Sequence, residues 1–402
     1  MTSSLRNPPR RRELVLTVAA MLFGLACGRD EPPPAVATAP MPAAAPVDPD
    51  DPRTCVSCHA TVVQEWEQSM HSRAHESRDP IFAGMRRARM KREGPEIAKA
   101  CAQCHYPRDA AMTKPEVAER GVVCSSCHLA AELHHERGPG AKAIVWSEGV
   151  MAGPHDLAAG LSPAHGSGPA PDFMKDGSSL CLTCHAAASN PQGVASCTTG
   201  LEWQHGKGDS CVSCHMPQTD GPSGAVSAAR AQHRSHQFLG PHRAWLQDDP
   251  SVLASAVELS ARFVDVAVVV TLANLSQHGF PSGFPGRMAA VVAVGRDASG
   301  AEVWRSAPAG NLTEAPQALL RKVYVDAQGK PVPAAMATEL QLDSRLSNGE
   351  RREIRFEGVG AEVAAVQVVL QYFLLPPPLA AKLGVEGDEA EPKVVARVSI
   401  QR

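Results

Sequence analysis

Five short motifs of the form Cys-x-x-Cys-His dominate this chain of 402 residues. A random chain with the same 12 cysteines and 16 histidines would contain about 0.01 such motifs, so chance does not explain five. The pattern is typical of covalent haem attachment, in which each thiol adds to one vinyl group of the porphyrin and the histidine binds the iron. We therefore expect five covalently bound haem c groups. The residues of motifs one to five, in chain order, are Cys55, Cys58 and His59; Cys101, Cys104 and His105; Cys124, Cys127 and His128; Cys181, Cys184 and His185; and Cys211, Cys214 and His215.

Two other uses of paired cysteines compete with haem attachment. A Cys-x-x-Cys pair can be half of a structural zinc site, but four-coordinate zinc combines two such pairs and does not require a histidine directly after the second cysteine. Five pairs are also an odd number for that arrangement. Thiol redox pairs of the thioredoxin type accompany a βαβ pattern and do not repeat five times in one chain. Haem is therefore the favoured interpretation, with zinc and thiol chemistry as the alternatives.

The N-terminus has the pattern of a secretory signal. Four arginines precede an apolar run at residues 14–26, which is too short to span a bilayer. The run ends in Ala26-Cys27-Gly28, which is similar to a bacterial lipoprotein cleavage site, although Gly24 stands where leucine is usual; ordinary signal cleavage is the alternative. We expect residues 1–26 to be a signal peptide, Cys27 to carry a lipid anchor in the membrane, and the protein to be exported to the periplasm or cell envelope.

The composition of the chain changes twice after this signal. Residues 27–51 are rich in proline and alanine, which predicts a disordered tether. Residues 52–247 hold all five motifs among many glycines and prolines, with short helices expected at 60–74 and 97–106. Residues 250–402 contain β-type runs separated by turn signals. The expected fold is a mainly α-helical and irregular multihaem cytochrome domain followed by an all-β domain, an immunoglobulin-like sandwich. The expected strands are at residues 263–275, 288–294, 322–325, 337–342, 353–356, 363–373 and 394–400.

The sequence around the motifs resembles a known family. Residues 66–71, Trp-Glu-Gln-Ser-Met-His, match the Trp-x-x-Ser-x-His signature of cytochromes of the c-554 type, relatives of octahaem hydroxylamine oxidoreductase. Residues 121–124 (Gly-Val-Val-Cys), 202–203 (Glu-Trp) and 214–217 (Cys-His-Met-Pro) fit the same family. The resemblance covers residues 52–245 and implies a pentahaem cytochrome c of the c-554 or c-552 type.

A second resemblance lies at the start of the β-type segment. Residues 274–283, Asn-Leu-Ser-Gln-His-Gly-Phe-Pro-Ser-Gly, are similar to the Gly-His-x-(Phe/Leu)-Pro-Thr-Gly loop of multihaem cytochromes that carry a C-terminal β-sandwich. Here Gln277 replaces the usual glycine and Ser282 the threonine. The resemblance implies that His278 reaches a haem.

Eleven histidines lie outside the motifs, which is enough to supply a second ligand for every haem. Iron between two histidines has no open position and suits electron transfer, whereas iron with one free face can bind a small molecule. The candidate second ligands are His71, first by resemblance, then His236, His165, His278 and one of the adjacent pair His134 and His135, of which we choose His134. The other histidines are expected not to bind iron.

Composition limits the function classes. A formal net charge of −3 gives no general attraction to nucleic acid, so no such partner is expected. Aromatic residues make up only 4% of the chain, and haems would fill much of the core in their place. The favoured function is electron transfer between redox partner proteins, such as a quinol-linked donor, a terminal reductase or another cytochrome.

Two other functions stay open. By resemblance, the chain could be an oxidoreductase that acts on hydroxylamine, nitrite or tetrathionate at one open haem. All five motifs end in histidine, so the lysine that marks the active haem of some related reductases is absent, and no catalytic residue is assigned. The third function is a haem-bearing scaffold whose β domain docks a partner protein.

Overall fold

The computed structural model describes residues 47–204, 209–225, 230–308 and 311–402, all within one compact unit that spans residues 43–402. The predicted signal peptide of residues 1–26, the anchor at Cys27 and the tether up to residue 46 lie outside the described residues. Within the described residues, no helix combines the length and the apolar character needed to cross a membrane.

The last residues of the predicted tether are described, and they are bound to the folded chain. The Asp50 carboxylate accepts hydrogen bonds from Arg108 Nε at 2.7 Å and from Ser125 Oγ at 2.6 Å. Asp51, only 8% exposed, forms an ion pair with Arg120 at 3.2 Å. Asp50 and Asp51, which we expected to belong to a disordered tether, are therefore part of the fold.

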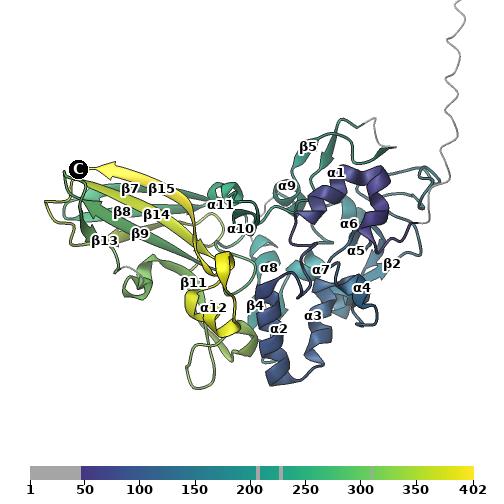
Figure 1. Ribbon diagram of the computed structural model, residues 1–402, viewed down its shortest axis with the longest axis horizontal. Coiled ribbons are helices and arrows are strands. Elements are labelled where there is room, and N and C mark those ends of the chain that lie inside the picture. Colours follow the sequence, from purple (N-terminus) through teal and green to yellow (C-terminus); the bar gives the residue numbers. More distant parts are fainter. Residues whose placement is uncertain (1–46, 205–208, 226–229, 309–310) are drawn as a thin grey trace, which may run out of the picture. The chain divides into compact units, whose positions relative to one another are not determined.

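The first part of the fold, which we call the helical region (residues 52–255), is built from short helices (Figure 1). Its longest helices are α1 (Val56–Glu67), α2 (Pro80–Glu93) and α3 (Ile97–His105). Asp79 caps α2 by accepting a hydrogen bond from the Phe82 N–H at 2.9 Å, and Pro80 stands in the first turn, where no N–H partner is needed. α2 was not predicted from the sequence, and α1 ends at Glu67 instead of continuing to residue 74.

Many one-turn elements complete the helical region. The other α-helices are α4 (Pro115–Ala118), α5 (Cys124–His128), α6 (Asp172–Lys175), α7 (Leu182–His185), α8 (Thr199–Gln204), α9 (Cys211–His215), α10 (Arg243–Leu246) and α11 (Ser251–Ser255). The 3-10 helices are η1 (Pro52–Cys55), η2 (Pro107–Asp109), η3 (His135–Arg137) and η4 (Gly140–Ala143). Three antiparallel hairpins pair β1 (Ala130–Leu133) with β2 (Ile144–Trp146), β3 (Ala188–Ser189) with β4 (Ala195–Cys197), and β5 (Gln218–Asp220) with β6 (Gln232–Arg234).

The second part, the strand region (residues 257–402), consists of two antiparallel sheets (Figure 1). A six-stranded sheet has the order β12-β11-β9-β14-β15, with β10 paired to β9, and a three-stranded sheet has the order β13-β8-β7. The strands are β7 (Val257–Val264), β8 (Ala267–Asn274), β9 (Met288–Arg296), β10 (Glu302–Arg305), β11 (Leu319–Val325), β12 (Glu339–Asp343), β13 (Arg351–Phe356), β14 (Ala365–Phe373) and β15 (Lys393–Gln401). The helices are η6 (Leu312–Glu314), η7 (Pro316–Ala318), η8 (Ala334–Met336), α12 (Pro377–Leu383) and η9 (Gly387–Ala390).

The run that we expected to form one strand at residues 263–275 belongs to two strands. Asp265 adopts a φ of +52°, and the chain turns there so that Val264 of β7 pairs with Ala267 of β8. All eight residues of β8, the central strand of its sheet, are buried, so both of its faces are covered. A strand covered on both faces reads as a continuous apolar run, so the sequence alone did not reveal the turn.

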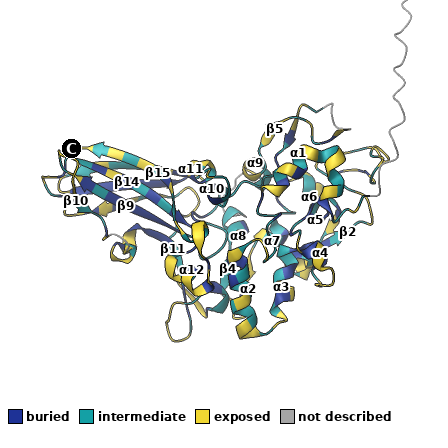
Figure 2. Cartoon of the chain, in the orientation of Figure 1, coloured by how far each residue is buried: buried dark blue, intermediate teal, exposed yellow. Residues whose placement is uncertain are grey.

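The two sheets bury their inner faces in one hydrophobic core (Figure 2). Val268 and Leu272 of β8 and Val366 and Leu370 of β14 are all 0% exposed within it. Trp245 of α10 belongs to the same core, so the helical region also packs against the strands. The immunoglobulin-like type of the sandwich and the domain boundaries stay predictions.

Candidate haem sites and their axial histidines

Each of the five motifs occupies a single helical turn. Residues at positions i, i+3 and i+4 of a helix lie on one face, so the two cysteines and the histidine of a motif point the same way. Motif two ends α3, motif three is the whole of α5 and motif five is the whole of α9. Motifs one and four begin at Cys55 and Cys181, the N-cap residues of α1 and α7. This arrangement suits two thioether bonds and one iron ligand on the same face.

Four of the five motif histidines face a second histidine. The ring centroids are 6.4 Å apart for His59 and His165, 6.3 Å for His185 and His71, 6.1 Å for His128 and His236, and 6.3 Å for His215 and His278. The angle between the ring planes ranges from 14° in the pair at motif five to 41° in the pair at motif four. The four partners are the first four candidates that the sequence analysis named as second ligands.

This spacing fits an iron atom between the two rings. A metal–imidazole bond is about 2 Å long and the ring centre lies about 1 Å beyond the nitrogen, so two imidazoles on one iron have centroids about 6 Å apart. The buried Nε atom of Arg73 provides a second observation, because it has no hydrogen-bond partner among the described residues. Such cations bind carboxylates, and haem carries two of them. The residues present therefore fit haem.

Backbone carbonyl groups orient most of these rings. A carbonyl oxygen lies 2.5–3.0 Å from the Nδ1 atom of His59, His128, His215, His165, His236 and His278. When Nδ1–H donates to a carbonyl, the other ring nitrogen, Nε2, keeps its lone pair for a metal.

Burial keeps the rings neutral. It lowers the pKa of His71 and His236 to about 3 and the pKa of His185 to about 4. Neutral imidazole is the form that binds iron, so these three side chains are ready to bind near pH 7.

Motif two differs from the other four motifs. Within the described parts of the chain, no histidine ring lies opposite His105; instead the ring of Phe82 stacks on it, with centroids 3.6 Å apart and planes 8° apart. His105 Nδ1 lies 2.8 Å from the Ala74 carbonyl oxygen, as in the other motifs. Motif two therefore offers one histidine that could bind haem iron, and the described residues place no second histidine opposite it.

His134, the fifth candidate for a second ligand, has a different environment. Its Nε2 lies 3.0 Å from a Glu132 carboxylate oxygen and its Nδ1 lies 3.2 Å from a Glu136 carboxylate oxygen. Both ring nitrogens are therefore engaged, and no motif histidine faces this ring in the part of the chain that the structure describes. The structure gives no support to iron binding by His134, which stays a prediction.

The motifs lie against one another. Their thiols interact between Cys55 and Cys124, between Cys104 and Cys184, and between Cys181 and Cys211. Motif one is therefore beside motif three, and motif four is beside motifs two and five. His71 and His236, the partners of motifs four and three, interact electrostatically, which brings motif three close to motif four as well.

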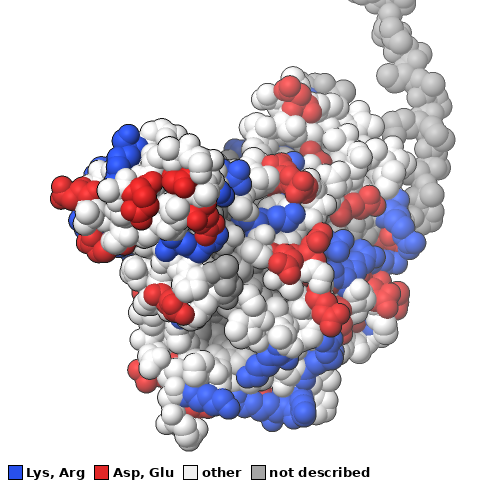
Figure 3. Space-filling model, turned by 60° about the vertical axis from the view of Figure 1, so that its left-hand side comes forward, with Lys and Arg blue, Asp and Glu red and all other residues white. Residues whose placement is uncertain are grey.

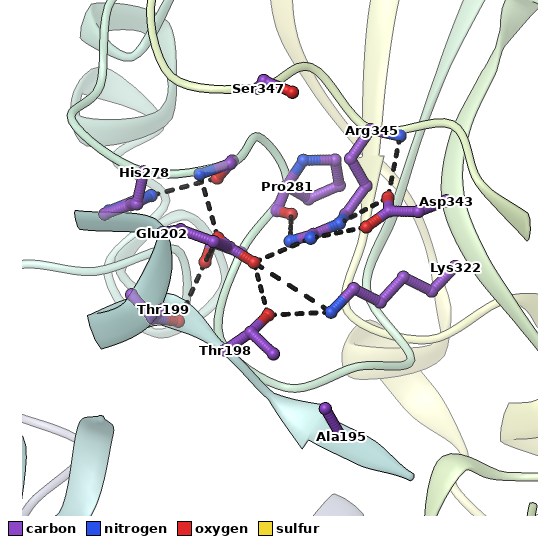
Figure 4. A network of polar contacts seen from close by, with 12 residues as sticks. Ala195, Thr198, Thr199, Glu202, His278, Pro281, Lys322, Asp343, Arg345 and Ser347 are labelled. Atoms are coloured by element: carbon purple, nitrogen blue, oxygen red, sulfur yellow. Dashed lines mark hydrogen bonds and ion pairs between the residues drawn. The ribbon is translucent and has the colours of Figure 1, made fainter. Parts of the chain in front are cut away.

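A polar network holds the loop of residues 274–283, which carries His278 (Figure 4). Its centre is Glu202 of α8. The Glu202 Oε2 atom accepts hydrogen bonds from the Gly279 N–H at 3.0 Å and from Ser282 Oγ at 3.1 Å. A carboxylate of the helical region therefore binds the loop of the strand region directly beside a candidate ligand.

Charged neighbours keep Glu202 ionised. Arg345 donates to Glu202 Oε1 at 2.7 Å and also binds Asp343, while Lys322 donates to Thr198 at 2.9 Å and Thr198 donates to Glu202. Burial opposes the ionisation of Glu202, but the hydrogen bonds from Arg345 and Thr198 outweigh it and lower the pKa of Glu202 to about 2.

Sequence reasoning missed the residues that hold the ligand-bearing loops. Glu65 of α1 accepts a hydrogen bond from the backbone N–H of His236 at 2.9 Å, and Glu202 holds the loop of His278. Glu202 was noted as part of a family signature but was given no role. Arg345 lies 143 positions further along the chain, and no local pattern connects the two.

Comparison with known proteins agrees with this geometry. A family model described as cytochrome c554 and c-prime matches residues 54–129, which contain motifs one to three. The crystal structure of a penta-heme cytochrome c552 from Thermochromatium tepidum is 25% identical in sequence, with a TM-score of 0.73 over 87% of this chain and 97% of that chain. The chain is therefore similar to multihaem cytochromes c, both in its first three motifs and over most of its fold. The predicted resemblance to c-554 and c-552 cytochromes is thereby confirmed.

This similarity supports haem c as the cofactor of the Cys-x-x-Cys-His motifs and electron transfer as the broad function. A second solved chain, a protein from Agrobacterium tumefaciens, is 13% identical over 43% of this chain and 58% of that chain; its TM-score of 0.17 carries no argument. The chain matches no curated protein.

Proposed function

We propose that this chain is an exported pentahaem cytochrome that transfers electrons, with at least four haems held between two histidines. The four pairs of facing histidines carry the proposal. Bound haem iron takes up and releases single electrons. A histidine on each face of the iron leaves no position for a substrate, so these four sites suit electron transfer rather than catalysis.

Contacts among the motifs support passage of electrons through the protein. Motif four is beside motifs two and five, motif one is beside motif three, and the histidine partners of motifs three and four interact. The five motifs therefore form one connected, branched set centred on motif four. Burial and hydrogen bonding of the axial histidines are the levers by which this chain would set the reduction potential at each motif.

The partners would be redox proteins, such as a quinol-linked donor, a terminal reductase or another cytochrome. Both signs of charge are spread over the face drawn in Figure 3, and a row of Lys and Arg residues runs along its lower edge. Three exposed basic residues belong to α2: Arg87, Lys91 and Arg92. Because the formal net charge is only −3, local groups of charge rather than net attraction would orient a partner.

The proposal places the protein in the periplasm or at the cell envelope, with a lipid on Cys27. The signal pattern at residues 1–26 and the proline-rich segment that follows support it. Replacing Cys27 with Ser should move the protein from the membrane fraction to the soluble periplasmic fraction without changing its haem content. A wild-type protein found wholly in the soluble fraction would contradict the anchor.

We propose that residues 250–402, which include the strand region, form an immunoglobulin-like sandwich domain that takes part in the electron-transfer site. It carries His278, whose ring lies 6.3 Å from that of His215 in motif five. One haem would then be held between the two regions, which are packed together in any case through the shared core.

Electron paramagnetic resonance of the oxidised protein, together with pyridine haemochrome quantitation, tests the electron-transfer proposal. We expect five haems per chain and low-spin signals for at least four of them, because facing histidines give iron a strong field on both sides. A spectrum dominated by high-spin iron would contradict it.

The environment of His105 favours a second candidate function. Because no histidine faces His105 among the described residues, iron at motif two would keep one face for a small molecule. The chain would then be an oxidoreductase for a small nitrogen or sulfur compound, such as hydroxylamine, nitrite or tetrathionate. A high-spin signal of about one haem equivalent that disappears on addition of cyanide would support this function. A fifth low-spin signal that does not respond to cyanide would remove it.

A further inference from the structure

Gly279 connects Glu202 to His278 through a single residue. The Gly279 carbonyl oxygen lies 3.0 Å from His278 Nδ1, so it accepts the hydrogen bond that orients the imidazole. The Gly279 N–H donates to Glu202 Oε2 at 3.0 Å. A shift of Gly279 would therefore turn the His278 ring. Glu202, which belongs to the helical region, opposes such a shift through its hydrogen bond to the Gly279 N–H.

The strand region holds the other side of the same loop. Asn274 Nδ2 donates to the His278 carbonyl oxygen at 2.7 Å and to the Ser347 carbonyl oxygen at 2.9 Å. These bonds fix the loop to its own sheet but make no link to the helical region. Glu202 supplies that link, together with Thr199, whose hydroxyl accepts a hydrogen bond from the Gly283 N–H at 3.1 Å.

The charges around Glu202 make its position well defined. The side chains of Lys322 and Arg345 are 4% and 12% exposed, and the carboxylates that face them are Glu202 and Asp343. A buried cation that loses its carboxylate is destabilised, so each partner restrains the others. Glu202 therefore cannot move away from Arg345 without leaving a buried cation short of a partner.

A second carboxylate of the helical region makes a contact of the same kind. Glu65 Oε2 accepts a hydrogen bond from the His236 N–H at 2.9 Å, and His236 faces His128 of motif three. In both cases a glutamate from the helical region binds the backbone at or next to a histidine that faces a motif. The contact at Glu202 differs because its loop comes from the strand region.

We propose that Glu202 is a positioning residue that holds the imidazole of His278 opposite His215 by binding Gly279 and Ser282, and thereby tunes the haem of motif five. The inference rests on the proposed function, since it requires His278 to bind iron. The planes of this pair are 14° apart, the smallest angle of the four pairs. The low-spin resonance of iron between two imidazoles depends on this angle, so a turned His278 ring changes a signal that reports on the ligand itself.

Four variants of the full-length haem-loaded protein test the proposal: H278A, E202A, E202Q and E353Q. H278A removes the ligand. E202A removes both loop contacts, whereas E202Q keeps the size of the side chain and one acceptor oxygen. E353Q is the matched control, because it makes the same chemical change at a carboxylate of the strand region that binds an arginine, Arg262, outside the network of Glu202. The readouts are the resonance spectrum and the midpoint potentials from a redox titration.

We expect H278A to convert about one haem equivalent to high-spin iron. E202A should change the low-spin signal and the midpoint potential of one haem, E202Q should change them less, and E353Q should match the wild type. If E202A fails to take up haem, the spectrum and midpoint potentials of E202Q alone test the role of Glu202. Wild-type spectra and potentials for the glutamate variants, with a normal effect of H278A, would overturn the role of Glu202 while leaving the proposed ligand intact. An unchanged H278A spectrum would instead overturn the ligand, and with it the role of Glu202.

Discussion

At the scale of single residues, the pairing of histidines separates ligands from bystanders. His233 shows the contrast, because its Nε2 lies 3.2 Å from a Glu65 carboxylate oxygen and its Nδ1 lies 2.8 Å from the Gly221 carbonyl oxygen. Both of its nitrogens are occupied, although the side chain is as buried as a ligand. Burial alone therefore does not mark an iron ligand in this chain; a free Nε2 facing a motif histidine does.

Single substitutions of the facing histidines should each affect one haem. We expect alanine at position 71, 165 or 236 to turn about one haem equivalent from low-spin to high-spin iron, because each iron loses one of its two imidazoles. His134→Ala is the matched control and should leave the resonance spectrum unchanged, since its ring is bound by Glu132 and Glu136. If His134→Ala converted a haem to high-spin iron, His134 would be an iron ligand, and its contacts with Glu132 and Glu136 would not be those of the haem-loaded protein.

Gly121 occupies a position that tolerates no side chain. Its φ is +73°, and a Cβ atom there would lie 2.4 Å from the His71 carbonyl oxygen. Gly121→Ala should lower the free energy of unfolding by about 2–4 kcal/mol, from backbone strain and from displacement of the segment that carries His71. Chemical denaturation measures the loss, and the low-spin signal of the pair His71–His185 should change with it.

Gly160→Ala is the control for this substitution. Gly160 has nearly the same φ, +75°, but a Cβ atom there meets nothing within 4 Å. It should therefore show only the cost of the backbone conformation, about 1 kcal/mol, and an unchanged spectrum. Equal effects of the two substitutions would mean that the contact with His71 contributes nothing.

At the scale of elements, the loop of residues 274–283 depends on one buried amide. Asn274 is 3% exposed; its Nδ2 donates to the His278 and Ser347 carbonyl oxygens, and its Oδ1 accepts from the Ser276 N–H. Asn274→Ala leaves these buried groups without partners and should cost about 2–4 kcal/mol in the free energy of unfolding. Asn348→Ala, which removes one exposed hydrogen bond to the Gln277 carbonyl oxygen, should cost about 0.5 kcal/mol or less. Denaturation curves for both variants give the comparison, and similar losses would contradict the role of Asn274.

The elements also show which sequence patterns were informative. The helix at residues 97–105 and the strand at residues 288–296 follow the predicted ranges closely, because each is a single apolar segment with clear ends. α2 was not predicted because most of its sequence is rich in arginine and lysine. Its few buried apolar residues, among them Ile81 and Phe82, do not form a clear helical pattern. The turn at Asp265 was missed because the strand after it is buried on both faces and gives no alternation.

At the scale of the whole molecule, the sequence predicts the haem-attachment motifs but does not predict which distant histidine faces each motif. Five attachment motifs have a fixed local spacing, so the sequence alone locates every anchor. A second ligand can come from anywhere in the chain: His71 faces His185, and His278 faces His215. Family signatures singled out these two histidines, but only the fold shows which motif each one faces. The chain has more histidines than five haems require, so their number did not predict that no histidine among the described residues would face His105.

The ionisation of Glu202, which binds the strand region to the helical region, should also make the stability of the protein depend on pH. The pKa of Glu202 is about 2 in the folded protein against an ordinary value of 4.5, so its contribution to stability is fully present above pH 4.5 and is lost as the pH falls toward 2. The wild-type protein should therefore lose stability more steeply than E202Q between pH 5 and pH 3, by less than about 1 kcal/mol per pH unit, because the partly exposed carboxylate is screened by water. Denaturation of both proteins at several pH values measures the two slopes. Since protonation of the histidines contributes equally to both proteins, the difference isolates Glu202, and parallel curves would show that the carboxylate is not held as an ion by Arg345.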